Sequence, residues 1–489
     1  MVETRMLIAS QRIPLDQQRS IPVTSPIDGR VLGHVSDASP DQVTDAIVSG
    51  EVAYATWRKV SGVERSRLMN RLADLIEAEA DAIARLETLD NGKLLRETKA
   101  QALFAARNYR YFAGIADKLE GRTVPLDSWE TFDYTQREPL GVVALITAWN
   151  SPMQLLANKL APALAAGCTA VIKPSEIAPL STLELGRLIS EAGFPPGVVN
   201  IITGGVEAGV ALTSSSRLGG ISFTGSVATG QAIAQAASRT LVPVTLELGG
   251  KSANIIFDDA DLDRAVPGAV AGIFAAGGQT CIAGSRLLVH SDVAEEVETR
   301  LADVAKNIQL GDPFDESTQM GPVASGSQRS RILSIVEEAR KNSRLLAGGS
   351  TPSDAVLDGG SYVSPTVFAD VDPASSLAQE EVFGPVLAIT RFDTEEEAIR
   401  IANSTEFGLA SGLWTTDLTR AHRVARELLA GTVWVNTYRY SAAQAPFGGV
   451  KKSGFGRERG LEAIDAYLRT KNVLIDLSGE IRDPFAIRS

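Results

Sequence analysis

Two repeating patterns of hydrophobic and polar residues divide the first part of the chain. Between Gly62 and Leu119, apolar residues recur three and four positions apart, which is the spacing that buries one face of a helix. Residues 1–60 instead carry short apolar runs and a turn signal at 25–29, which predict short strands and turns. Residues 120–139 alternate apolar and polar side chains, as an exposed hairpin does.

From residue 142 onward, short apolar runs alternate with helical stretches. The first series predicts strands at 142–146, 170–172, 198–202, 221–223 and 242–246. A second series predicts strands at 253–257, 287–290, 386–392, 409–415 and 432–436, and helices at 292–306, 329–341 and 417–429. This alternation is typical of parallel sheets that are covered by helices on both faces, and such sheets bind ligands beyond the carboxyl ends of their strands.

The composition narrows the classes of function. The 489 residues are 44% hydrophobic and 22% charged, which indicates a folded chain of about two to four domains. A net charge of −12 disfavours nucleic acid or an anionic membrane as a partner. No apolar run is long enough to span a membrane, and the N-terminal residues lack a signal-peptide core. Two cysteines and three histidines offer little material for disulfides or a metal site, so we expect a cytoplasmic protein without a metal.

One carboxylate and one thiol stand out in glycine-rich surroundings. Glu247 ends a predicted strand just before Gly249-Gly250, and Cys281 closes the segment Gly278-Gln-Thr-Cys281. A thiol can attack a carbonyl carbon, and a carboxylate can activate water against the thioester that results. Taken singly, Cys281 is more typical of a buried structural thiol, and Glu247 of an ordinary strand-end acid. Cys168 lies in an apolar run and keeps the structural interpretation.

Other strand ends carry candidate ligand contacts. Residues 225–230 open a helix whose backbone N–H groups can face a phosphate, although a plain strand-to-helix turn fits their spacing equally well. Lys173 and Glu176 can contact a ribose, and the Asn150 amide can donate to an oxyanion. Singly, a solvated strand end and a turn asparagine are the commoner explanations. A Walker A loop is rejected because Thr245 stands where that motif requires glycine.

Taken together, these segments are similar to the NAD(P)-dependent aldehyde dehydrogenase superfamily across nearly the full length of the chain. The motifs also follow one another in the order that the family shows. The resemblance rests on Trp149-Asn-Ser-Pro152, Lys173-Pro-Ser-Glu176, Phe223-Thr-Gly-Ser226, Leu246-Glu-Leu-Gly-Gly-Lys251, Gly278-Gln-Thr-Cys281, Glu380-Glu-Val-Phe-Gly-Pro385 and Pro446-Phe-Gly-Gly449.

The resemblance implies a role for each matching residue. Cys281 is the implied nucleophile, Glu247 the general base, and the Asn150 side chain with the Cys281 backbone N–H the oxyanion hole. Glu458 matches a second acid that is sometimes invoked as a proton relay. Val227 departs from many relatives, which have threonine there, and so removes a hydroxyl near the cofactor phosphates. The implied cofactor contacts are Lys173, Glu176, Gly225, Ser226, Glu381, Phe383, Trp149 and Leu248.

The family fold that the resemblance implies is α/β with three parts. Residues 1–119 and 140–248 would form a Rossmann-like NAD-binding domain, on which 453–470 pack back. Residues 249–452 would form a second α/β domain, the catalytic domain, and residues 120–139 with 471–489 a small β oligomerisation element. Homodimers or homotetramers are usual among the relatives.

The implied reaction is the NAD-dependent oxidation of an aldehyde to a carboxylic acid. A Cys281 thiohemiacetal would become a thioester, which water activated by Glu247 would hydrolyse. NADP is expected to serve less well, because the Glu176 carboxylate would repel a 2′-phosphate. A CoA-acylating dehydrogenase, an ATP-dependent kinase and a non-catalytic binding protein remain as alternatives.

Tyr438, Arg439 and Phe447 are the candidate substrate contacts, because the matching loop of relatives lines the mouth of the aldehyde tunnel. Arg439 lies between two tyrosines in an acidic protein. A guanidinium there can bind a carboxylate or other polar oxygen at the far end of the aldehyde. A surface or inter-subunit salt bridge is the plainer interpretation of the same residue.

Overall fold

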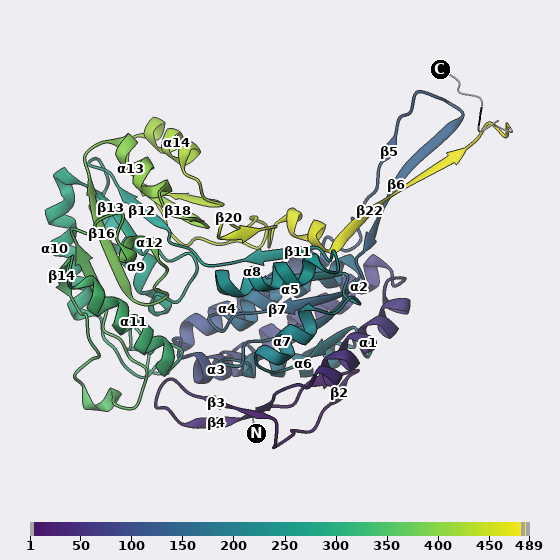
Figure 1. Ribbon diagram of the computed structural model, residues 1–489, viewed down its shortest axis with the longest axis horizontal. Coiled ribbons are helices and arrows are strands. Elements are labelled where there is room, and N and C mark those ends of the chain that lie inside the picture. The colour runs from purple at the N-terminus through teal and green to yellow at the C-terminus, as the bar shows by residue number, and fades with distance from the viewer. Residues whose placement is uncertain (1–3, 481–484, 486–489) are drawn as a thin grey trace.

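Two α/β units lie side by side, and a β ribbon projects from one of them (Figure 1). The computed structural model describes residues 4–480 and Phe485. The remaining positions, which include most of the last ten residues of the predicted oligomerisation element 471–489, lie outside the described residues. None of the helices within 4–480 is long and apolar enough to cross a membrane.

The first unit is built on an eight-stranded sheet in the order β2-β1-β9-β8-β7-β10-β11-β21. Its five central strands are parallel, as the alternating pattern predicted, while β1, β2 and β21 pair antiparallel at the edges. The register aligns Ile146 with Lys173 and Thr224 with Glu247, so these strands end at a common edge. The strands are β1 Leu7–Ile8, β2 Gln11–Arg12, β7 Val142–Ile146, β8 Thr169–Lys173, β9 Val199–Ile201, β10 Gly220–Thr224, β11 Val244–Glu247 and β21 Gly454–Phe455.

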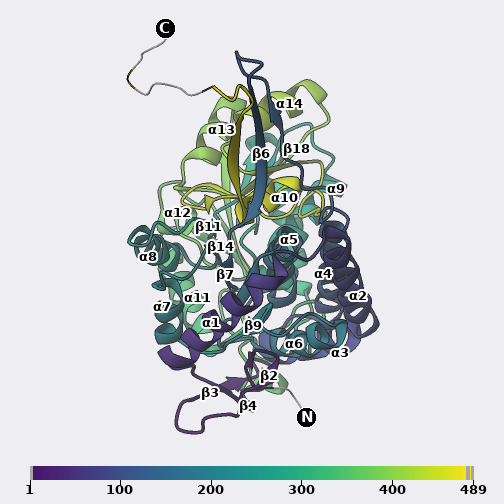
Figure 2. The same cartoon turned by 90° about the vertical axis from the view of Figure 1, so that its right-hand side faces the viewer.

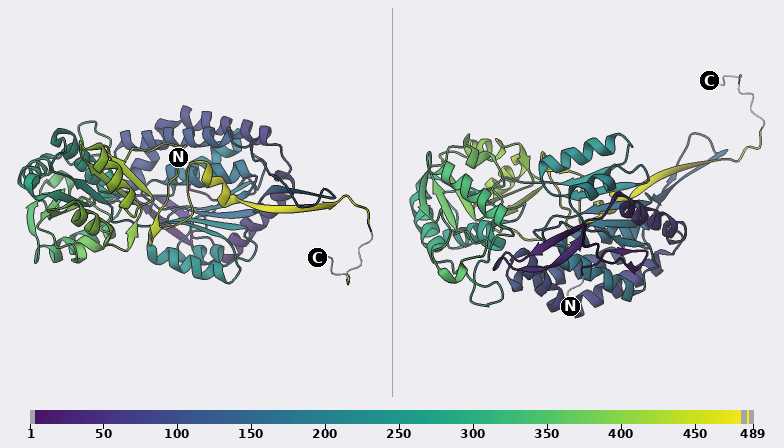
Figure 3. Two further views of the ribbon diagram at one scale, coloured as in Figure 1. Left: turned by 90° about the horizontal axis from the view of Figure 1, so that it is seen from above. Right: turned by 60° about the horizontal axis from the view of Figure 1, so that its bottom comes forward.

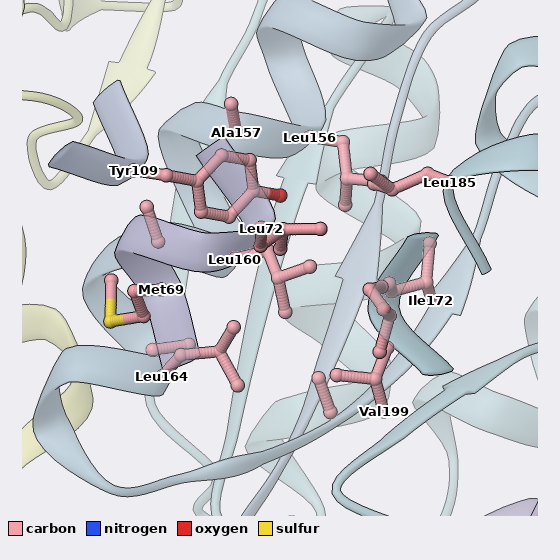
Figure 4. Packing of buried hydrophobic residues seen from close by; sticks show 14 of the residues in the cluster. Met69, Leu72, Tyr109, Leu156, Ala157, Leu160, Leu164, Ile172, Leu185 and Val199 are labelled. Carbon is pink, nitrogen blue, oxygen red and sulfur yellow. The ribbon is translucent and has the colours of Figure 1, made fainter. Parts of the chain in front are cut away.

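Helices cover both faces of this sheet, as Figure 3 shows from above. Side chains alternate along each strand, so Val143 and Leu145 enter one core while Val142 and Ala144 enter the other. Figure 4 shows the first of these cores, where Met69, Leu72 and Tyr109 meet helix α5. One face carries α2 Gly62–Ala78, α3 Ala80–Asn91, α4 Leu95–Ala113, α5 Pro152–Ala166 and α6 Leu180–Ala192, and the other carries α1 Pro40–Trp57, α7 Val206–Thr213 and α8 Val227–Ser238.

The prediction of only strands and turns in residues 1–60 is wrong for α1. Pro40 occupies its first turn, and the Ser39 side chain accepts a hydrogen bond from the N–H of Gln42, which completes a capping box. Three of the six buried residues of α1 are alanine or glycine, and two valines on its exposed face, Val48 and Val52, blur the apolar stripe, so its helical period is weak in the sequence. The predicted strands and turns before it do form a hairpin of β3 Ser20–Thr24 and β4 Val31–Ser36.

The second unit holds a seven-stranded sheet in the order β14-β15-β16-β13-β12-β18-β19. All neighbouring strands are parallel except β14 and β15, which pair antiparallel. The sequence pattern did not predict these two strands. The strands are β12 Ala253–Ile256, β13 Arg286–His290, β14 Arg344–Ala347, β15 Thr366–Ala369, β16 Val386–Phe392, β18 Ala410–Trp414 and β19 Thr432–Val435. The helices are α9 Leu262–Phe274, α10 Ser291–Asn307, α11 Gly326–Ala339, α12 Ser376–Gln379, α13 Glu395–Asn403 and α14 Leu418–Glu427.

The projecting ribbon joins β5 Thr123–Val124, β6 Thr131–Pro139 and β22 Leu468–Asp476 into one antiparallel sheet. Figure 1 shows it extending away from both α/β units, and in Figure 2, where the side that carries the ribbon faces the viewer, β6 is drawn in front of the second unit. Phe132, Leu474 and Ile475 on this ribbon are exposed. A short pair of β17 Phe407–Gly408 and β20 Val450–Lys451, with 3₁₀ turns at Ala275–Gly278, Ala355–Leu357 and Leu461–Tyr467, completes the fold.

Candidate active site

The carboxyl ends of the first sheet face a loop of the second unit across a shared cavity. Asn150 follows β7 and Glu247 ends β11, while Cys281 follows the 3₁₀ turn Ala275–Gly278 after α9. The cavity has a volume of about 310 Å³ and brings these three residues to one site. Its other walls include Trp149, Thr224, Gly225, Ser226, Leu248, Gly249, Gln328, Arg331, Glu381 and Phe383.

The Cys281 loop has an unusual backbone. Ala276, Gly277 and Gly278 all adopt left-handed conformations, with φ of 55°, 60° and 70°. A side chain at Gly278 would collide with the carbonyl group of Gly384, so glycine is required there for space as well as for φ. The loop delivers Cys281 half-buried and unpaired to the cavity.

The Cys281 thiol is not activated in advance. Burial raises its pKa to about 12, and the negative charges of Glu381 and Glu247 add to this shift. The thiol is therefore protonated at neutral pH, and its proton must pass to a base before it can attack. Cys168 differs, because it is fully buried and donates from Sγ to the carbonyl oxygen of Tyr467 at 3.3 Å, as a structural thiol does.

Glu247 is a buried carboxyl group without a hydrogen-bond partner. Only 3% of the residue is exposed, and neither carboxylate oxygen accepts a hydrogen bond. Burial raises its pKa well above the ordinary value, and the negative charge of Glu458 raises it further. A carboxylate with a raised pKa is a stronger base near neutral pH, which suits proton abstraction from the thiol or from water.

The Asn150 amide is directed at the Cys281 loop. Its Nδ2 donates to the carbonyl oxygen of Gln279 at 3.0 Å, two residues before the thiol. The N–H of Cys281 makes no hydrogen bond to the backbone of the described residues. The Asn150 amide and the Cys281 N–H come from different units and both belong to residues that line this cavity, an arrangement that suits stabilisation of an oxyanion.

Glu458 lies behind Glu247 with its charge compensated. It forms a fully buried ion pair with Lys159, and it accepts a hydrogen bond from Asn158 Nδ2 at 3.2 Å. Lys159 also donates to Ser222 Oγ at 3.0 Å. The sequence pointed to Glu458 but not to its two partners, although a lysine and an asparagine at adjacent positions of the largely apolar α5 are a visible anomaly.

Four predicted cofactor contacts form one end of the cavity. Trp149 and Phe383 meet edge to face, with ring centroids 5.2 Å apart. Glu381 accepts a hydrogen bond from the N–H of Gly250 at 2.8 Å, and any side chain at Gly249 would collide with its carboxylate. Leu248 lies against Gly230 of α8, where the missing side chain leaves it room.

The remaining predicted cofactor contacts lie at neighbouring strand ends. Gly225 and Ser226 immediately precede α8, and Ser226 Oγ accepts a hydrogen bond from the N–H of Thr229. Lys173 ends β8, where it is 6% exposed, and its Nζ lies 3.8 Å from a carboxylate oxygen of Glu176. Lys173 and Glu176 are not among the residues that line the cavity around Cys281.

Two residues that sequence reasoning missed hold the Glu381–Phe383 loop. Arg331 donates to the carbonyl oxygens of Glu381 and Val382 at 2.7 and 2.8 Å, and Gln328 Nε2 donates to that of Phe383 at 2.8 Å. Both belong to α11, about fifty positions before the loop. No local pattern marks such a contact, because its partners are backbone carbonyls.

The three candidate substrate contacts are in different environments. Tyr438 is buried, and its hydroxyl donates to the carbonyl oxygen of Ile282 at 3.1 Å. Arg439 Nη1 donates to the carbonyl oxygens of Ala271 and Ala275 at 3.2 and 3.0 Å. Phe447 is half-buried beneath the guanidinium of Arg459, whose Cζ lies 4.4 Å from the ring centroid.

Comparison with known proteins agrees with this geometry. The aldehyde dehydrogenase family model matches residues 14–473, so the chain belongs to the aldehyde dehydrogenase family. Betaine aldehyde dehydrogenase of Cereibacter sphaeroides is 46% identical over 96% of this chain and 97% of its own length. The (Z)-2-((N-methylformamido)methylene)-5-hydroxybutyrolactone dehydrogenase of Acinetobacter baylyi is 44% identical over 95% of this chain and 96% of its own. A crystal structure of a betaine aldehyde dehydrogenase point mutant from Staphylococcus aureus, in complex with NAD⁺, is 38% identical, covers all of both chains and has a TM-score of 0.97.

The different settings of the two thiols give a first prediction. Cys281→Ala should abolish aldehyde-dependent NADH formation while leaving NAD binding intact, because it removes only the nucleophile. Cys168→Ala is the matched control, and it should retain activity and cost at most about 1 kcal/mol of unfolding free energy. Steady-state turnover, NAD titration and thermal unfolding of both variants check this, and substantial turnover by the Cys281 variant would contradict it.

Proposed function

We propose that this protein oxidises an aldehyde to a carboxylic acid with NAD as the electron acceptor. The observation that carries the proposal is the meeting of Cys281, Glu247 and Asn150 in one cavity. A thiol, a base without a hydrogen-bond partner and an oxyanion donor are the groups that covalent oxidation and hydrolysis of an acyl group require.

The walls of the cavity fit a dinucleotide. The N-terminus of α8 follows Gly225 and Ser226, and its backbone N–H groups suit a pyrophosphate. Glu381 can accept hydrogen bonds from the hydroxyls of the nicotinamide ribose. Lys173 and Glu176 would contact the adenosine ribose. When bound, NAD supplies the hydride acceptor that converts a thiohemiacetal into a thioester.

The residues of the chain perform the remaining steps. Glu247 accepts the proton of Cys281, and the thiolate attacks the aldehyde carbon. The Asn150 amide and the Cys281 N–H stabilise the oxygen of the thiohemiacetal. After oxidation, Glu247 releases this first proton to solvent and is again a carboxylate. It then takes a proton from water, and the resulting hydroxide attacks the thioester and releases the carboxylic acid and the Cys281 thiolate, which recovers its proton from Glu247.

Hydrolysis is favoured over transfer of the acyl group to CoA. A carboxylate that no other side chain engages is free to activate water, whereas a CoA-acylating enzyme has no need of such a base. The proposal therefore requires NADH formation from aldehyde and NAD without CoA. Dependence on CoA would favour the alternative.

Glu247→Gln separates the two halves of this reaction. Because Glu247 accepts both the thiol proton and a proton of water in this mechanism, the variant should form about one NADH per site in a slowed burst, followed by steady turnover roughly 10²–10⁴ times slower than in the wild type. A burst at the wild-type rate would confine Glu247 to the activation of water. Stopped-flow measurement of NADH distinguishes these results, and unchanged steady turnover would remove Glu247 from the mechanism.

NAD should be preferred over NADP. The Glu176 carboxylate is suited to a ribose 2′-hydroxyl, and its charge would repel a 2′-phosphate by on the order of 1–4 kcal/mol at about 4 Å. The Nζ of Lys173 lies 3.8 Å from a carboxylate oxygen of Glu176, and its positive charge reduces this repulsion without reversing it. Glu176→Gln should therefore narrow the ratio of kcat/KM between the two cofactors. Equal kcat/KM for both cofactors in the wild type would contradict the assignment.

We further propose that the aldehyde carries a carboxylate or another polar oxygen. Burial lowers the pKa of Arg439 and of Arg459, while the proximity of Cys281 opposes that shift at each. Arg439 contacts the start of the Cys281 loop, since its Nη1 donates to the carbonyl oxygen of Ala275 at 3.0 Å. A guanidinium there suits a polar oxygen and would repel a quaternary ammonium group. Two relatives are named for very different compounds, betaine aldehyde and a hydroxybutyrolactone. Both are almost equally similar to this chain in sequence, so the percentage of sequence identity does not indicate which substrate this protein uses.

Arg439→Leu tests this choice of substrate. On a carboxylated aldehyde, kcat/KM should fall about ten- to hundredfold, the equivalent of one charge-assisted hydrogen bond, whereas a neutral aldehyde of similar size should be little affected. Arg264→Leu is the matched control, since Arg264 is an exposed residue of α9 whose side chain donates a hydrogen bond to the carbonyl oxygen of Asn436. Equal loss on both substrates, or none, rejects the assignment.

We also propose a cytoplasmic homodimer or homotetramer. The exposed apolar residues Phe132, Leu474 and Ile475 on the projecting ribbon suit association with a second copy. Both cysteines are unpaired, which suits a reducing compartment. Light scattering of the purified protein tests the assembly, and a monomer at micromolar concentration would contradict it.

A further inference from the structure

The segment that leads into helix α4 touches both halves of the catalytic site. Lys93 precedes the helix and Glu97 lies in its first turn. Lys93 Nζ donates to the backbone carbonyl oxygen of Asn150 and to Ser151 Oγ, each at 3.0 Å. Glu97 Oε1 accepts a hydrogen bond from the N–H of Ala276 at 2.9 Å. One short stretch thus holds the oxyanion asparagine with one side chain and the Cys281 loop with the other.

Burying the ammonium group of Lys93 costs free energy, so the acceptors that compensate it indicate what the residue does. The residue is 5% exposed, and burial lowers its pKa to about 8 against the opposing charges of Glu97 and Glu87. A buried ammonium needs hydrogen-bond acceptors. Two of them are the Asn150 carbonyl and the Ser151 hydroxyl, at the turn that orients the Asn150 amide. Gln101 Nε2 supports this turn from the same helix by donating to Ser151 Oγ at 3.3 Å.

Glu97 engages the least favourable point of the Cys281 loop. Ala276 has a φ of 55°, a conformation that costs free energy for any residue with a side chain. Its N–H is fixed by the Glu97 carboxylate, and a hydrogen bond to a charged acceptor is stronger than a neutral one. The left-handed run from Ala276 to Gly278 leads directly to Gln279, whose carbonyl accepts from Asn150.

The same segment is fastened to the second unit at two more points. The N–H of Leu95 donates to the carbonyl oxygen of Pro313 at 3.0 Å, and Arg96 Nη2 donates to that of Thr318 at 2.8 Å. The segment that leads into α4 therefore packs with the first unit and forms hydrogen bonds with the second unit. It spans the boundary across which Asn150 and Cys281 must meet.

We propose that Lys93 and Glu97 are positioning residues that together fix the separation between the Asn150 amide and the Cys281 N–H. Neither needs to touch the substrate. Lys93 acts through the Asn150 turn, and Glu97 acts through the backbone of the Cys281 loop. The inference rests on the proposed dehydrogenase activity and adds to it the part of the chain that keeps the oxyanion site assembled.

Lys93→Met tests the first half, because methionine keeps the length of the side chain and removes the donor. Loss of a direct oxyanion donor costs about 10²–10³ in kcat, so loss of its support should lower kcat by about tenfold. The KM for aldehyde and the affinity for NAD should not change. Lys99→Met is the matched control on the same helix, since Lys99 pairs only with Asp81 at the surface, and it should behave as the wild type.

A double-mutant cycle shows whether Lys93 acts through Asn150. In an Asn150→Ala background, Lys93→Met should cause little further loss of kcat, because the group that it positions is already gone. Fully additive losses would overturn the proposal and leave Lys93 with a general structural role. Full activity of Lys93→Met alone would overturn it as well.

Two substitutions at Glu97 test the second half. Glu97→Gln keeps an oxygen that can accept from the Ala276 N–H and should rescue most of the activity that Glu97→Leu loses. Equal loss in both variants would mean that charge rather than loop support matters, and this would overturn the Glu97 assignment. If Glu97→Leu proves unstable on thermal unfolding, the Glu97→Gln result decides. A wild-type protein that forms no NADH would refute the proposed function instead, so the two failures are distinguishable.

Discussion

Burial of ionisable groups with incomplete compensation is the constraint on which the catalytic site depends. Glu247 has no hydrogen-bond partner for either oxygen, and the nearby Cys281 thiol is buried beside negative charge. Desolvation disfavours the charged form of each group and so raises the pKa of both. A water molecule in the cavity can donate to the Glu247 carboxylate, which has no donor among the described residues. The site is therefore reactive because the Glu247 carboxylate lacks a hydrogen-bond partner among the described residues.

The fold can tolerate the buried, unpaired carboxyl group of Glu247 because the neighbouring charge of Glu458 is neutralised by an ion pair. Glu458 could not lie so close to Glu247 as a free carboxylate, and Lys159 neutralises it with support from Asn158 and Ser222. Removing one member of a buried pair leaves an uncompensated charge, which costs more than the pair itself contributes. We therefore regard the Lys159–Glu458 pair as the structural condition for placing two carboxyl groups side by side, while the positive charge of Lys159 limits the rise in the pKa of Glu247.

Much of the fold and the chemical centre could be predicted from the sequence, because their signals are local. Apolar runs located the central strands of both sheets, and glycine-flanked motifs located Cys281 and Glu247. Helix α1 was missed because half of its buried residues are alanine or glycine and two valines lie on its exposed face. Contacts between distant segments were missed for a different reason. Lys93 meets Asn150 across 57 positions and Glu97 meets Ala276 across 179, and no periodicity records such pairs.

The origin of the reacting groups in separate units has a mechanical consequence. Glu247 is carried by the first sheet and Cys281 by a loop of the second unit, so a slide of one unit past the other changes the distance between base and nucleophile. The contacts that oppose such a slide are also contacts of the site. Asn150 Nδ2 reaches Gln279, Gly250 N–H reaches Glu381, and Glu97 reaches Ala276. Because rate depends steeply on the placement of reacting atoms, the hydrogen bonds that join the two units stabilise the fold and set the rate together.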